Sequence, residues 1–207
     1  MLSKAATKIL VWSLLIVSCS DSERRINDQL LTSINDTLKQ DISISGEILM
    51  VERNWVRTLG LNSLENGTSN PEIRIWEDSA VFFGRLFIIN YLNASWKAEL
   101  IRYRYLSTAS SIPDSLAGER VKLTEPKSGW TRFLNKLLDL EILTLPDYKI
   151  LPDYFMATDE NFVKVEIGKL NYYRCYEYPD PYWRRNYREA RQMIQILEFI
   201  KKEFSIK

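Results

Sequence analysis

The chain has 207 residues, of which 45% are hydrophobic and 27% are charged, the composition of one ordinary globular domain with a real core. Its 28 basic and 27 acidic residues nearly balance, which excludes the basic surface of a nucleic-acid-binding protein. The absence of histidine excludes Ser-His-Asp and Cys-His nucleophile systems and leaves little basis for a zinc site. We therefore expect no metal, no cofactor and no nucleic-acid partner.

The chain begins with a basic segment and continues with an apolar one. Lys4 and Lys8 precede an apolar run over residues 9–17. That run is about half of the ~20 residues that a transmembrane helix needs. A basic start, a short apolar core and a small residue before a cleavage site are typical of a secretory signal peptide. We expect residues 1–18 to be such a peptide and to be removed.

The end of this segment, Ile16-Val17-Ser18-Cys19, resembles the lipobox of bacterial lipoproteins. The resemblance implies cleavage before Cys19, lipidation of its sulfur and acylation of the new N-terminus, with palmitate-type chains as a stable membrane anchor. Ser20, rather than aspartate, follows the cysteine, and the sorting rule of enteric bacteria then points to the outer membrane. Residues 19–22 are expected to form the anchor and a short tether, with the lipid in either the periplasmic or the surface-exposed leaflet.

Residues 23–207 are expected to form a single α+β domain. An amphipathic helix is predicted over residues 22–40 and a first strand near residues 47–52, followed by a polar loop over residues 60–71. Alternating or continuously apolar runs then predict a series of antiparallel strands. These runs span residues 72–76, 81–92 and 97–106, a loop at 107–118 and a short run at 119–123.

The second half of the chain predicts two more helices and a hairpin. Helical spacing covers residues 130–140 and 186–204, and residues 162–168 and 171–178 alternate on either side of a tight turn. Two Leu-Pro-Asp-Tyr copies between them predict turns, since proline fixes φ and aspartate bonds its own backbone. The sum is a curved antiparallel sheet with helices packed on one face, bounded by N- and C-terminal amphipathic helices.

Tyrosines gather near the end of the hairpin and form the best candidate binding surface. Aromatic rings with polar groups can stack on sugars or peptides. The C-terminal helix must also bury its apolar stripe, and a tyrosine-rich strand face is a natural partner for it, so core packing is the alternative. The candidate ligand-binding residues are Tyr172, Tyr176, Tyr178, Tyr182 and Trp183.

Carboxylates are the remaining catalytic resource of the chain. Glu166 and Glu177 are predicted to lie opposite each other on the hairpin, but spacing does not establish the paired geometry that a glycosidase needs. Cys175 is expected to be a small buried hydrophobe. We therefore expect a non-enzymatic lipoprotein of a Gram-negative envelope that binds an outer-membrane protein or another ligand. The alternatives are a carboxylate-based hydrolase of envelope glycans and an immunity-type inhibitor of a toxin.

Overall fold

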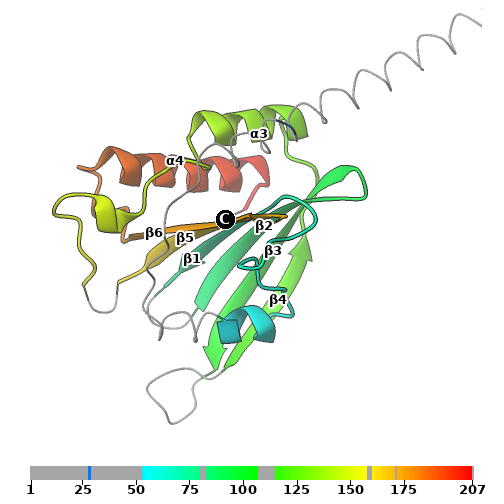
Figure 1. The fold of residues 1–207 in the computed structure, drawn as a ribbon, viewed down its shortest axis with the longest axis horizontal. Helices are drawn as coiled ribbons and strands as arrows, with labels where there is room; N and C mark the ends of the chain where they lie inside the picture. Colours follow the sequence, from blue (N-terminus) through cyan, green and yellow to red (C-terminus); the bar gives the residue numbers. More distant parts are fainter. Residues whose placement is uncertain are drawn as a thin grey trace, which may run out of the picture.

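The computed structural model describes residue 28 and residues 53–79, 83–106, 115–157, 160–170 and 172–206. Six strands form one antiparallel sheet in the order β4-β3-β2-β1-β5-β6 (Figure 1). This arrangement confirms the predicted α+β fold. The elements are β1 (Glu72–Asp78), β2 (Phe83–Leu92), β3 (Ser95–Leu106), β4 (Ser115–Lys122), α3 (Trp130–Asp139), the 3-10 helix η1 (Tyr148–Ile150), β5 (Phe162–Lys169), β6 (Tyr172–Pro179) and α4 (Arg188–Glu203).

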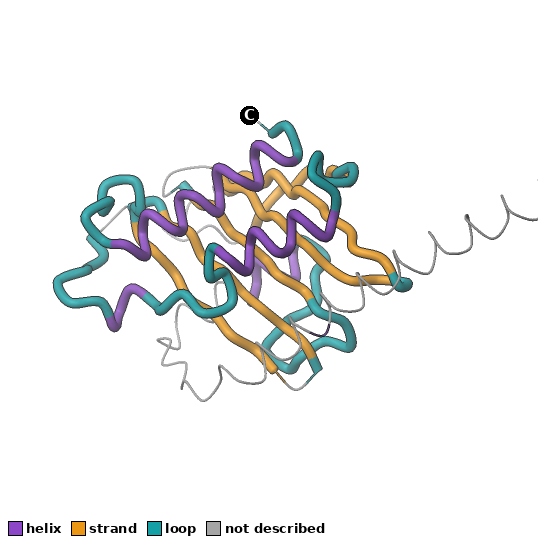
Figure 2. The backbone as a smooth tube through the Cα atoms, turned by 90° about the horizontal axis from the view of Figure 1, so that it is seen from above, coloured by secondary structure: helices purple, strands orange, loops and turns teal. Residues whose placement is uncertain are grey.

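Helices α3 and α4 lie side by side across one face of the sheet and cover the main core (Figure 2). Apolar side chains recur at helical spacing on both, so each helix presents one apolar stripe to the strands. Every second side chain of each strand points toward this face of the sheet and packs against the helices. The buried side chains at this interface include Phe133, Leu134 and Leu137 of α3, Met193, Ile196, Leu197 and Ile200 of α4, and Ile75, Phe87, Leu100 and Val165 of the sheet.

The opposite face of the sheet carries a second, smaller core. Residues 53–58 are helical and lie below the strands in Figure 1. Val56 and Leu59 pack there against Leu86, Ile88 and Ile101. Strand β2 is apolar on both faces, so both faces need a cover. The sequence predicted helices on one face only, and this short helix is an addition to that picture.

Most of the predicted elements of the second half are confirmed. The hairpin forms from β5 and β6, with Val163, Val165 and Ile167 facing the helices and buried. The C-terminal amphipathic helix is α4. The aspartate of the first Leu-Pro-Asp-Tyr copy acts as expected, because Asp147 Oδ1 accepts a hydrogen bond of 2.9 Å from the backbone N–H of Lys149.

Two predictions about the strands need correction. The predicted loop over residues 107–118 is too long, because β4 already begins at Ser115 and pairs with β3 up to Leu106. Pairing with a long neighbouring strand overrides the weak local pattern of Ser115–Gly118. The predicted strand over residues 72–76 continues to Asp78 for the same reason, since β2 and β5 both pair with it there.

The N-terminal predictions lie mostly outside the described residues. Asp28 is the one described member of the predicted helix over residues 22–40, and it is helical. The signal segment, Cys19 and the predicted strand near residues 47–52 all fall outside the described part of the chain. Among the residues that the structure describes, no helix is long and apolar enough to span a bilayer.

Candidate functional site

The structure divides the five predicted binding residues into two groups. Tyr176 and Tyr178 are buried in the main core, with 1% and 0% of their surface exposed. Tyr172 lies on the same face of β6 and packs, half-buried, against that core. Tyr182 and Trp183 follow the end of β6 and are 39% and 84% exposed. Core packing, the alternative left open by the sequence, therefore describes the buried pair, and the exposed pair is available to a ligand.

The buried tyrosines tie the sheet to the segment that follows α3. The hydroxyl of Tyr176 donates a 2.7 Å hydrogen bond to the carbonyl oxygen of Ile142. The hydroxyl of Tyr178 donates to the carbonyl oxygen of Pro146. Burial raises the pKa of both hydroxyls well above the ordinary value for tyrosine, since the charged phenolate is poorly solvated in the core. Both hydroxyls are occupied by this connection and face no solvent-filled space.

A cleft of about 400 Å³ opens beside the exposed pair. It lies where β1 ends and where β2 and β5 begin, and the corner after β6 and the last turn of α4 complete its walls. This volume lies within the range of small-molecule sites, about 300–1,000 Å³. The aromatic residues in the wall are Phe83, Phe162, Tyr182 and Trp183. The polar ones are Glu77, Asp78, Ser79, Arg85, Asn161, Asp180 and Lys201.

The corner that carries Tyr182 and Trp183 is held by its own backbone. Asp180 has a φ of 39°, a left-handed conformation that aspartate tolerates better than most residues. Its N–H donates to the carbonyl oxygen of Asn161 at 2.7 Å, and its carboxylate accepts from the Asn161 amide at 3.0 Å. The N–H of Trp183 then donates to the Asp180 carbonyl oxygen at 2.9 Å, which closes the turn. The exposed ring of Trp183 thus stands on an ordered turn.

Charges of both signs alternate in the wall of the cleft. Lys201 on α4 donates a 2.5 Å hydrogen bond to Oε1 of Glu77 at the end of β1. The other carboxylate oxygen of Glu77, Oε2, is buried and has no hydrogen-bond partner among the described residues. Burial raises the pKa of the Tyr182 hydroxyl, with the negative charges of Glu77 and Glu198 adding to this effect and Arg185 opposing it.

The two carboxylates proposed for catalysis lie on the face of the hairpin away from α3 and α4. They are not opposite each other, because the register pairs Glu166 with Cys175 and Glu177 with Lys164. Glu166 is buried and accepts hydrogen bonds of 2.6 Å from the Trp76 indole and 2.7 Å from the Tyr173 hydroxyl. The prediction of an opposed pair was wrong because sequence spacing does not fix the residues of the turn.

Both carboxylates are also compensated by lysines. Lys164 Nζ lies 4.0 Å from Oε1 of Glu166, and Lys149 Nζ lies 3.3 Å from Oε1 of Glu177. Cys175, on the same face, is half-buried rather than fully buried as expected. Within the described ranges, no group of acidic or cysteine residues is arranged to hold a metal ion.

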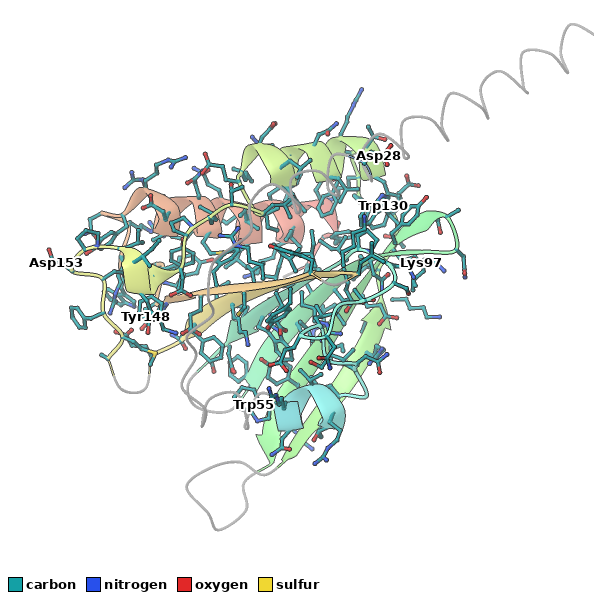
Figure 3. All side chains as sticks on the ribbon, viewed as in Figure 1. Asp28, Trp55, Lys97, Trp130, Tyr148 and Asp153 are labelled. Carbon is teal, nitrogen blue, oxygen red and sulfur yellow. The ribbon has the colours of Figure 1, made fainter. Side chains whose placement is uncertain are left out.

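Several cleft residues were not identified from the sequence. Phe83 is 61% exposed, although it lies in an apolar run that predicts a covered strand. Glu77 and Lys201 are distant in sequence and meet only because α4 crosses the end of β1. Among the residues that line the cleft, the sequence identified Tyr182 and Trp183. Figure 3 shows the side chains of the described residues on the ribbon.

The chain matches no protein-family model. Comparison with curated proteins and with solved structures finds no match either.

Proposed function

We propose that this chain is a lipid-anchored, non-enzymatic binding protein of a Gram-negative cell envelope. Cys19 carries the lipid, and the domain binds a ligand or protein partner at the outer membrane through the cleft beside Trp183. The observation that carries the binding proposal is an open cleft with a tryptophan that is 84% exposed on an ordered turn. Large exposed aromatic surface beside a cleft is a feature of interaction sites.

The position of Asp28 supports a cleft that faces away from the membrane. Burial lowers the pKa of the Lys169 amine, and the nearby Asp28 carboxylate opposes this effect. Lys169 ends β5, whereas Phe162 begins that strand and lines the cleft. The eight residues of β5 place these two ends about 23 Å apart. Figure 3 likewise shows Asp28 on the same side of the molecule as Lys97 and Trp130.

Asp28 therefore lies near the end of β5 that is opposite the cleft. We propose that the lipid on Cys19, nine residues earlier in the sequence, lies on the side of Asp28, so that the cleft faces away from the membrane. This orientation suits a ligand or partner presented from the aqueous side of the envelope.

The anchor is tested by replacing its cysteine. Cells that make the Cys19→Ser variant should incorporate no labelled palmitate into this protein, and the variant should leave the membrane fraction. The Cys175→Ser variant is the matched control and should keep both label and location. Equal labelling of the Cys19→Ser variant and the unmodified chain would contradict the anchor.

The cleft is tested by crosslinking in the producing cells. A photo-reactive amino acid at position 183 should give a discrete adduct in the envelope. The same group at Ile150, which is exposed and outside the cleft, should give none. Failure to obtain a specific adduct at position 183 would contradict binding at this cleft.

A further inference from the structure

The cleft offers hydrogen-bond donors and acceptors in close alternation. Donors come from Arg85, Lys201 and the Asn161 amide, and acceptors come from the carboxylates of Glu77 and Asp180. Lys201 already donates to Glu77, and the Asn161 amide already donates to Asp180. The further N–H donors of Lys201 and the further lone pairs of the carboxylates would lose water to a purely apolar ligand, which is costly. The ligand that fits must therefore carry donors and acceptors of its own.

The aromatic rings offer a second kind of contact. Trp183 and Phe83 are both more than half exposed, and they lie at the edge of the same cleft. The face of an aromatic ring is electronegative and attracts C–H groups that carry partial positive charge. A sugar ring has such C–H groups on its faces and hydroxyls around its edge.

The charges of the wall argue against charged ligands. A cationic peptide that approaches Asp180 also meets Arg85 and Lys201, and an anionic peptide that approaches Arg85 and Lys201 also meets Asp180. Like charges placed together are unfavourable, so neither sign is well accommodated. A neutral ligand rich in hydroxyls avoids this conflict.

We propose that the cleft binds a neutral saccharide, with a sugar face stacked on Trp183 and its hydroxyls bonded to the polar groups of the wall. This inference rests on the proposed function, because it names the ligand class of the same cleft. The ordered turn at Asp180–Trp183 holds the stacking ring before the ligand arrives, and such preorganisation lowers the entropic cost of binding.

The experiment measures binding of three neutral hexasaccharides to the full-length protein by calorimetry. The probes are maltohexaose, cellohexaose and hexa-N-acetylchitohexaose. The protein is kept in a zwitterionic detergent, because a detergent with a sugar head group would compete for the cleft. At least one probe should bind, and the Trp183→Ala variant should weaken that binding about tenfold or more.

Two variants make the result specific. The Trp183→Tyr variant keeps an aromatic face and should retain most of the affinity. The Phe155→Ala variant removes another exposed aromatic side chain that lies outside the cleft, and it should bind like the unmodified chain. Binding that is unchanged by Trp183→Ala would overturn the stacking proposal.

Pentalysine and pentaglutamate peptides test the other ligand classes in the same assay. If a peptide binds in a manner that requires Trp183 and no hexasaccharide binds, the saccharide proposal is wrong. Crosslinking at position 183 then decides separately whether the cleft is a binding site. A specific protein adduct there, without saccharide binding, would overturn this inference and leave the proposed function intact.

Discussion

Two groups of aromatic residues lie within eight positions of each other, and one is buried whereas the other is exposed. Tyr176 and Tyr178 belong to β6 and alternate onto the face that α3 and α4 cover. Tyr182 and Trp183 come after the strand has ended at Pro179, where the alternation no longer applies. Both groups consist of large aromatic residues, so position relative to the sheet decides which group builds the core and which faces solvent.

The largest effect is expected from removing a buried tyrosine. Tyr178→Ala should lower the free energy of unfolding by about 3–5 kcal/mol, since it leaves a cavity in the core. It also leaves the carbonyl oxygen of Pro146 without its donor. Urea unfolding followed by circular dichroism measures this loss. A change below about 1 kcal/mol would show that Tyr178 is not part of a close-packed core.

A smaller effect is expected when only the hydroxyl is removed. Tyr178→Phe should cost about 1–3 kcal/mol at neutral pH, because the buried carbonyl oxygen of Pro146 loses its donor. The measurement is again urea unfolding, with Tyr182→Phe as the control on the exposed side of the comparison. Equal losses in the two variants would contradict the division between core and surface.

The same hydroxyl gives a pH dependence. The folded-state pKa of Tyr178 is raised above its unfolded value of 10.0. Its contribution to stability is therefore complete below about pH 10 and is lost above it, because the unfolded chain ionises first. Above about pH 10, each buried tyrosine of this kind should lower the free energy of unfolding by about 1.4 kcal/mol per pH unit. Between pH 9 and about pH 11, the free energy of unfolding should decline less steeply for Tyr178→Phe than for the unmodified chain.

A modest effect is expected for the ion pair in the cleft. Lys201→Met removes the partner of Glu77, and both side chains are only partly buried. The free energy of unfolding should fall by about 1 kcal/mol or less, and high salt should reduce the difference. Thermal unfolding at low and high salt measures both effects. A loss of several kcal/mol would place this pair in the core rather than in the cleft.

The smallest effect on stability is expected for the exposed tryptophan. Trp183→Ala should change the free energy of unfolding by no more than about 0.5 kcal/mol, because most of the ring is already in water. Urea unfolding beside Tyr178→Ala measures the contrast directly. A loss comparable to that of the buried tyrosine would mean that Trp183 supports the fold and is not reserved for binding.

The regular elements could be predicted because their patterns are local. The hairpin of β5 and β6 and the stripe of α4 follow directly from spacing, as does the covered strand β2. The short helix over residues 53–58, which covers the second face of the sheet, could not be predicted. It has less than two turns, and its partners on β2 and β3 are remote in sequence.

The site was only half predictable for a related reason. Tyr182 and Trp183 could be found because aromatic residues gather in the sequence near the end of the hairpin. Phe83, Glu77 and Lys201 join them only through strand pairing and the crossing of α4, which are non-local. The same limit explains the error at Glu166 and Glu177, where register decides which residues face each other.

We expect the cleft beside Trp183 to be occupied in the cell, and oxidative footprinting of intact cells measures this occupancy. Trp183 should be oxidised more slowly in intact cells than in the purified full-length protein. The exposed side chains of Phe155 and Met156 lie outside the cleft and should react equally in both samples. Equal oxidation of Trp183 in cells and in the purified protein would contradict the account.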